Sequence, residues 1–381
     1  MDITTQLTEL LCKLISFKSD GEERKIAEYV GTRLERSGFH TELQVLPQNQ
    51  KRGSIVAKIG NPAGKRILFE GHLDVVPAGN LWTVPPFEGT VKGEWIYGRG
   101  AVDMKSGVAA MIVAAEQLAK ETALLEQHQL ILCFVCDEER QCQGVKQYLS
   151  SPVFTGADYA VIGEPTGLEI CTCHRGSCHY KIRMHGLASH AARPQKGVNA
   201  IEKAVKALKV IEAYSEQLKL QTHEFLDART ITPTTIHAGI QDNMVPDVCE
   251  IVVDARIFPG ETAKSVLSPL CDRLDKLAEE DSEFFYDIEI TQEALGGEVP
   301  KDSPLVCAAS TVYHEVFSKF AVLKGFEVTC EQSFLIHAGI PTIIFGPGDC
   351  SLAHTPDEHV QIRDVEYAYR YYYALAKYLL T

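Results

Sequence analysis

The order of apolar and polar positions up to residue 163 predicts an alternation of helices and strands. The helical stretches repeat their apolar residues every three or four positions, whereas the strands are short apolar runs. Such alternation is typical of an α/β domain with a largely parallel sheet. We expect helices at 4–17, 22–38, 106–121 and after 143, and strands at 41–46, 54–60, 66–71, 129–136 and 158–163.

A different pattern begins near residue 179. Apolar and polar residues now alternate along the strands, and amphipathic helices separate them in the order strand-helix-strand-strand-helix-strand. This order is typical of a small α+β (ferredoxin-like) sandwich with helices on one face of an antiparallel sheet. The strands are expected at 179–186, 232–240, 249–257 and 285–291, and the helices at 199–218 and 263–280.

The α/β pattern returns after residue 294, with a helix at 304–317, a strand at 341–346 and a closing helix at 364–380. A chain of 381 residues exceeds the usual size of one hydrophobic core. We therefore predict two domains. The first comprises residues 1–178 and 294–381, and residues 179–293 are inserted into it as the second.

The charge of the chain excludes several classes of partner. The formal net charge is -14, with 51 acidic and 37 basic residues and no basic cluster, which argues against nucleic-acid and anionic-membrane surfaces. No segment reaches the roughly 18 apolar residues of a membrane span. The start carries Asp2 and Glu9, whereas a signal peptide begins with basic residues. The composition favours a cytoplasmic enzyme or small-ligand binder.

Twelve cysteines are scattered through apolar runs, as expected of reduced, buried thiols in a cytosolic protein. The segment 171–178 contains three of them and His174, which in principle could hold a structural zinc ion. A second C-x-x-C pair is missing at a usual distance, and alternate residues of a strand face opposite sides. We favour a partly buried strand over a zinc knuckle.

Metal-ligand side chains follow the predicted parallel strands. The carboxyl ends of such strands lie along one edge of the sheet, where α/β proteins place their sites. Asp103 lies in a glycine-rich loop that enters a helix from the same edge. The residues that we expect to converge with it are His72 and Asp74, then Asp137, Glu138 and Glu139, then Glu164, and finally His354.

Several carboxylates crowded around two imidazoles require a cation. Nitrogen and carboxylate ligands without thiolate suit catalytic zinc, with cobalt or manganese as alternatives, and a bridging carboxylate can hold two ions. We predict that one ion is bound by His72, Asp103 and Glu164. The second ion is then bound by Asp103, Glu139 and His354. Asp74 would accept the second N–H of the His72 imidazole.

The adjacent glutamates then have separate roles. Because neighbouring side chains diverge, Glu139 can bind metal while Glu138 takes a proton from the attacking water. The predicted reaction is hydrolysis of an amide or peptide bond.

Seven short motifs along the chain are GHLDVVP (71–77), YGRGAVDMKSG (97–107), DEE (137–139), GEPT (163–166), ASHAARPQKGVNAI (188–201), DNMVPDVCEIVVDAR (242–256) and GPGDCSLAHTPDE (346–358). With these motifs the chain resembles the dinuclear-zinc aminoacylase and carboxypeptidase family, of the acetylornithine deacetylase and succinyl-diaminopimelate desuccinylase type. The resemblance implies the same five metal ligands, Glu138 as general acid and base, and Asp74 as the support of His72. It also implies a lid domain that closes over the site and forms a homodimer.

The family pattern further assigns roles to three residues of the inserted domain. His190 would stabilise the oxyanion, reaching the site of the partner subunit, and Asn243 and Arg256 would contact a substrate carboxylate. For Arg256 the alternative is a simple ion pair with Asp254, two residues away on the same strand face.

The motifs look most like those of acetylornithine deacetylase, which implies removal of an acetyl group from an N-acetyl-L-amino acid, N-acetylornithine first, as in arginine biosynthesis. A desuccinylase, a carboxypeptidase or a dipeptidase is the alternative, because the segment 328–335 departs from the Gly-Gly-Thr-Asp type of stretch seen in relatives. A third hypothesis is that the chain is a catalytically silent binding protein. It is disfavoured because all five ligands and Glu138 are present.

Overall fold

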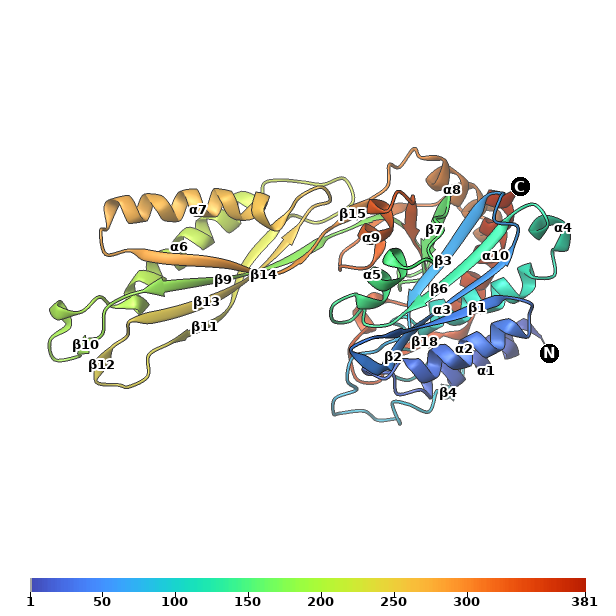
Figure 1. Ribbon diagram of the computed structural model, residues 1–381, viewed down its shortest axis with the longest axis horizontal. Coiled ribbons are helices and arrows are strands. Elements are labelled where there is room, and N and C mark those ends of the chain that lie inside the picture. The colour runs from blue at the N-terminus through green and yellow to red at the C-terminus, as the bar shows by residue number, and fades with distance from the viewer. Residues whose placement is uncertain (1) are drawn as a thin grey trace. The chain divides into compact units, whose positions relative to one another are not determined.

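The computed structural model describes residues 2–381 and divides the chain into two compact units. Of the described residues, unit 1 comprises 2–172, 298–324 and 330–381, and unit 2 comprises 173–297 and 325–329. Figure 1 shows the elements of both. No helix of residues 2–381 is long and apolar enough to cross a membrane.

Unit 1 is built on a mixed sheet whose centre is parallel. Strands β6, β3, β7 and β17 lie side by side in this order and run in the same direction. The edges are antiparallel: β1 and β2 form a hairpin, β2 pairs with β6, and β8 pairs with β17. The strands are β1 (His40–Leu46), β2 (Asn49–Gly60), β3 (Arg66–His72), β6 (Gln129–Val135), β7 (Tyr159–Ile162), β8 (Ile170–His174) and β17 (Thr342–Ile344).

The antiparallel hairpin at the edge is a feature that the sequence pattern did not specify. The chain turns within the two residues between Leu46 and Asn49, and so short a connection joins only antiparallel strands. The shorter elements were also not expected: β4 (Thr90–Lys92), β5 (Trp95–Tyr97), β15 (Gly297–Glu298), β16 (Leu323–Phe326), β18 (His359–Gln361), α4 (Thr122–Leu125) and α9 (Gln332–His337).

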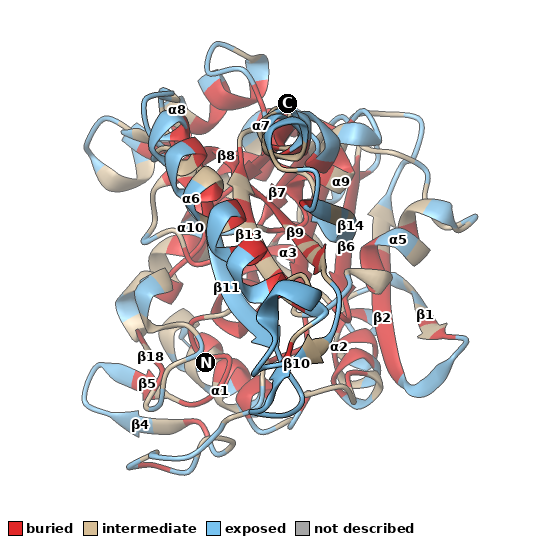
Figure 2. Ribbon diagram, turned by 90° about the vertical axis from the view of Figure 1, so that its left-hand side faces the viewer, coloured by how far each residue is buried: buried red, intermediate tan, exposed pale blue. Residues whose placement is uncertain are grey.

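The helices of unit 1 cover this sheet. Helix α3 is apolar on nearly all sides and is buried from Lys105 to Ala115, as expected of a helix enclosed by other elements. Helix α10 packs against α3 and α8. The central part of β2, red in Figure 2, is buried, and all residues of β6 are buried as well. The helices are α1 (Ile3–Ile15), α2 (Arg24–Glu35), α3 (Lys105–Leu118), α5 (Gln143–Ser150), α8 (Pro304–Phe317) and α10 (Ile362–Leu380).

Unit 2 has the βαββαβ order that the sequence predicted. Its four-stranded antiparallel sheet has the order β11-β13-β9-β14, so that the first and third long strands lie in the middle, as in a ferredoxin-like fold. The elements are β9 (Gly176–His185), β10 (Ser189–His190), α6 (Ala200–Leu218), β11 (Thr230–Ala238), β12 (Met244–Val245), β13 (Val248–Ile257), α7 (Ala263–Glu280) and β14 (Phe285–Ala294).

The core of unit 2 lies between its sheet and its helices. Alternate residues of β9 and β13 are buried against α6 and α7, which begin at side-chain caps from Asn199 and Thr262. Residues 325–329 belong to this unit as well. The Gly325 N–H donates to the Phe225 carbonyl, and the Asp227 N–H donates to the Glu327 carboxylate.

The close approach of α3 to the end of β7 gives a test of the packing. A Cβ atom on Gly107 would lie 2.0 Å from the carbonyl oxygen of Gly163, and a backbone atom cannot move aside. We expect Gly107→Ala to lower the free energy of unfolding by about 1–3 kcal/mol. The measurement is denaturant unfolding.

Gly31→Ala is the matched control, because it also places a methyl group in a buried helix. Its nearest neighbour is the tip of the Ile55 side chain, which can rotate. We expect the control to be neutral or up to about 1 kcal/mol stabilising, since alanine favours the helix. Equal effects of the two substitutions would contradict the role given to the Gly163 contact.

Candidate metal centre

The chemically reactive side chains of unit 1 follow its parallel strands. His72 is the last residue of β3, Glu138 and Glu139 come soon after β6, and Glu164 lies two residues beyond β7. His354 lies in the segment that follows β17. The four strands are parallel, so their carboxyl ends lie along the same edge of the sheet.

Asp103 lies between the two histidines. Its Oδ1 is 2.9 Å from Nε2 of His72, and its Oδ2 is 3.3 Å from Nε2 of His354. Glu164 Oε1 lies 3.7 Å from the same His72 nitrogen, and Glu139 Oε2 lies 3.0 Å from the same His354 nitrogen. The five side chains therefore form two groups that share Asp103.

Negative charge accumulates in this cluster. Burial raises the pKa of Glu164 and of Glu139, and the charge of Asp103 raises both further. Burial would also raise the pKa of Asp103, but hydrogen bonds from His354 and His72 hold it below its usual value. Burial opposes protonation of His72, yet the bond to Asp103 and the charge of Glu164 raise its pKa. Hydrogen bonds to Asp103 and Glu139 raise the pKa of His354 to about 10.

The donor set fits divalent cations. One ligand atom each of His72, Asp103 and Glu139 lies within 4.8 Å of the others. Imidazole nitrogen and carboxylate oxygen without thiolate suit zinc, cobalt or manganese. A cation held here would compensate the same negative charge that now raises the pKa values of both imidazoles. The two oxygens of Asp103 face different histidines, as a bridging ligand requires.

Glu138 belongs to the same electrostatic cluster. Burial raises its pKa well above the usual value; His72 opposes this rise, whereas Glu139 and Asp103 add to it. A carboxyl group with a raised pKa beside the ligands is suited to accept and return a proton near neutral pH.

Asp74 acts differently from the sequence prediction. The Nδ1–H of His72 donates to the backbone carbonyl of Asp74 at 3.0 Å, whereas the Asp74 Oδ1 is 3.7 Å away. The carboxylate of Asp74 instead accepts the backbone N–H groups of Glu138 and Glu139, each at 3.1 Å. The backbone carbonyl of Asp74 therefore orients His72. Its carboxylate holds the turn that contains Glu138 and Glu139, because it accepts two backbone N–H groups of that turn.

Arg52 supports this turn from the other side, and sequence reasoning missed it. Its guanidinium donates to both carboxylate oxygens of Glu23, at 2.9 and 2.7 Å, and to the carboxylate of Asp137. It also lies 4.0 Å from Asp74 Oδ2. All four side chains are buried. The only sequence signal is a pair of basic residues, Lys51 and Arg52, at the start of an apolar run, which is too common to be informative.

The three residues predicted to act from the inserted domain lie in unit 2. His190 is exposed in β10, and its Nδ1 accepts the N–H of Ala192. Asn243 is close to it, because the Asn243 carbonyl accepts the N–H of Ala191. Arg256 lies apart from them on β13 and donates to the Asp254 carboxylate at 3.0 and 3.3 Å, the ion pair that the sequence left as the alternative.

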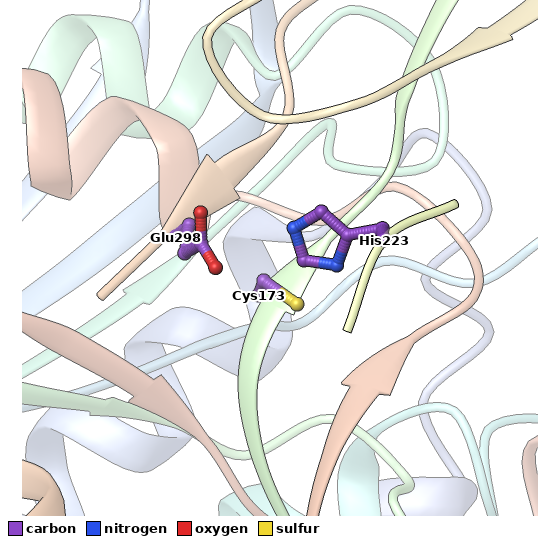
Figure 3. A group of neighbouring side chains, drawn as sticks. All are labelled: Cys173, His223 and Glu298. Carbon is purple, nitrogen blue, oxygen red and sulfur yellow. The ribbon is translucent and has the colours of Figure 1, made fainter. Parts of the chain in front are cut away.

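The cysteine-rich segment 171–178 forms β8 and the start of β9, and Cys171, Cys173 and Cys178 are buried there. Figure 3 shows Cys173 next to His223 of the same unit, with a sulfur-to-ring-nitrogen separation within 4.8 Å. Glu298, also drawn there, belongs to unit 1. We assign no metal site to this segment.

Comparisons with known proteins place the chain among metallohydrolases. Residues 68–378 match the profile of Peptidase family M20/M25/M40. An acetylornithine deacetylase from Salmonella arizonae is 32% identical over 336 residues, which covers 86% of this chain and 84% of the relative.

Solved structures share the whole fold. An M20 family metallo-carboxypeptidase from Sulfolobus solfataricus has a TM-score of 0.78 at 18% identity, covering 100% of both chains. A dinuclear metal binding peptidase of family M20 from Bacillus subtilis has a TM-score of 0.75 at 17% identity, covering 98% of this chain and 97% of that one. The predicted fold class is thereby confirmed.

The cluster around Asp103 predicts that metal stabilises the fold. Free Zn²⁺ at about 100 times its dissociation constant would add about 2.7 kcal/mol to the free energy of unfolding. We expect the midpoint of thermal unfolding to rise with Zn²⁺ and to fall with a chelator.

Asp103→Asn should lose most of this metal-dependent shift, because it removes the charge shared by both groups of ligands. Asp302→Asn is the control, since Asp302 is exposed near the start of α8. A midpoint that does not respond to Zn²⁺ or chelator in the unaltered protein would refute the metal centre.

Proposed function

Because the chain belongs to Peptidase family M20/M25/M40, a family of metal-dependent hydrolases, we propose that it removes the acetyl group from N-acetyl-L-amino acids, N-acetylornithine first. The main observation in support of the proposed chemistry is the position of Asp103 between two imidazoles, with the Glu138 carboxyl group beside them. The substrate class rests on the similarity to acetylornithine deacetylases over most of both chains.

Asp103 and the four side chains around it would hold two ions, zinc in preference to cobalt or manganese. His72, Asp103 and Glu164 form one set, and Asp103, Glu139 and His354 form the other. When bound, such ions polarise the amide carbonyl and lower the pKa of water to about 7.

Glu138 performs the proton transfers. Its carboxylate takes a proton from the attacking water, and its carboxylic acid returns the proton to the leaving amine nitrogen. The environment that raises its pKa favours this second step, because the protonated form must persist until the C–N bond breaks. The products are acetate and the free amino acid.

The inserted unit supplies the remaining contacts in this proposal. An N–H of the His190 imidazole donates to the carbonyl oxygen as it gains negative charge, and Arg256 and Asn243 hold the substrate carboxylate. Arg256 must then exchange its ion pair with Asp254 for the substrate, or share the guanidinium between them.

We also propose that unit 2 forms a homodimer. Strand β11 is an edge strand, paired on one side by β13 alone, and its side chains from Thr232 to Ala238 are exposed. The open backbone edge of such a strand is suited to pair with the same strand of a second copy.

The first test is a substrate panel. After loading with Zn²⁺ or Co²⁺, we expect N-acetylornithine to release acetate and primary amine in equal amounts, faster than N-succinyl-diaminopimelate or unblocked dipeptides. Glu138→Gln should retain metal and lower turnover by about 10²–10⁴-fold, because it removes the proton acceptor.

The control is Glu28→Gln, a change in a surface i,i+4 ion pair of α2 that should leave turnover unaltered. Cleavage of dipeptides alone would keep the metal chemistry and replace the substrate assignment. Full activity of Glu138→Gln would show that the base is another residue.

The second test addresses the dimer. A chain with His190→Ala and a chain with Glu138→Gln are each expected to be nearly inactive. If His190 acts in the site of the partner subunit, heterodimers contain one site with both groups intact. We expect activity to recover in purified heterodimers, up to about half of the unaltered dimer. No recovery would place His190 in the site of its own subunit or outside catalysis.

A further inference from the structure

Glu358 is a buried carboxylate to which the proposed chemistry gives no role. Its side chain is fully enclosed within unit 1. Oε1 accepts the backbone N–H groups of Val102 and Asp103, at 2.8 and 3.0 Å, and Oε2 accepts the N–H of Gly100 at 3.0 Å. The Arg99 guanidinium also donates to Oε2.

These hydrogen bonds fix the loop that contains Asp103. Gly100 has a φ of 83°, a left-handed conformation that turns its N–H inward without a side-chain penalty. Buried backbone N–H groups need hydrogen-bond acceptors. The Glu358 carboxylate is the acceptor for three N–H groups of this loop. Hydrogen bonds to an ionised acceptor are stronger than neutral ones, and buried Arg99 balances its charge.

Glu358 also connects this loop to the segment that carries His354. The backbone carbonyl of Glu358 accepts the N–H of Gly98 at 2.9 Å, in line with the pairing of β18 and β5. His354 lies four residues before Glu358 in the sequence. One residue therefore joins the two segments whose side chains meet at the 3.3 Å separation of Asp103 Oδ2 and His354 Nε2.

We propose that Glu358 is a positioning residue of the metal centre: by holding the 98–103 loop against the His354 segment, it sets the geometry in which Asp103 and His354 bind the same ion. The inference rests on the proposed metal centre and does not depend on the substrate. It differs from the role of Asp74, which accepts the backbone N–H groups of Glu138 and Glu139.

The test measures metal affinity and coordination without substrate. In Glu358→Gln the side chain keeps its length, but one oxygen becomes an N–H donor facing backbone donors. We expect 10–100-fold weaker binding of at least one ion, measured by competition with a chromophoric chelator on the metal-free protein. The visible spectrum of the Co²⁺-saturated variant should also change, because the ligand geometry changes.

Glu116→Gln is the matched control. Glu116 is also paired with an arginine of the same unit, accepting two bonds from Arg33 where Glu358 accepts one from Arg99, but its hydrogen bonds come from Arg33 and Gln6 and not from the 98–103 loop. We expect its affinity and its Co²⁺ spectrum to equal those of the unaltered protein.

A second variant, Glu358→Asp, keeps the charge and shortens the side chain by one methylene, so it serves if Glu358→Gln does not fold. It should also bind metal more weakly and with an altered Co²⁺ spectrum, because the shorter carboxylate cannot reach all three N–H groups.

Unchanged affinity in the folded variants would overturn the inference. So would weaker affinity of Glu358→Gln with an unaltered spectrum, since that pattern reports only a lost charge. Failure of the unaltered protein to bind metal would overturn the metal centre itself, and the role of Glu358 with it.

Discussion

The repulsion among carboxylates at one edge of the sheet is the constraint on which the rest of unit 1 depends. Glu138, Glu139 and Glu164 all have raised pKa values because they are buried together around Asp103. Positive charge relieves the repulsion, whether it comes from the imidazolium groups of His72 and His354 or from bound cations. The tendency to attract cations is therefore a direct consequence of how these strands end.

Holding such a cluster together requires support from the backbone around it. Two buried carboxylates that accept backbone N–H groups provide it. Asp74 accepts the N–H groups of the turn that carries Glu138 and Glu139, and Glu358 accepts those of the loop that carries Asp103. Each has a buried arginine nearby, which limits the cost of enclosing the charge. The acids of this unit thus divide into those that face the site and those that hold its loops.

In the proposed mechanism the two units divide the chemistry in a similar way. Unit 1 contains every proposed metal ligand and the proposed base, at the carboxyl ends of its parallel strands or in loops beside them. Unit 2 contains His190, Asn243 and Arg256 on an independent core with its own sheet and helices. Such a division is suited to an enzyme in which one unit provides the reactive groups and the other completes substrate recognition.

Much of this arrangement could be predicted from local patterns. Apolar runs followed by His72, Glu139 or Glu164 predicted strands and the polar residues at their ends, and parallel strand direction implied that these residues converge. The βαββαβ order of unit 2 could also be predicted, because apolar residues repeat at different intervals in strands and in helices. The antiparallel β1–β2 hairpin was not, because the second strand was expected only from residue 54, whereas β2 begins at Asn49 and leaves a turn of two residues.

By itself, the sequence determined the fold class and which residues are chemically able to bind metal and move protons, because periodicity and residue type are local properties. Only the tertiary structure decided how these residues are held. It placed Arg52 beside Glu23 and Asp137, turned the Asp74 carboxylate toward backbone N–H groups, and brought Glu358 to a loop more than 250 residues earlier in the chain. These contacts join distant segments whose separation and orientation no local pattern encodes.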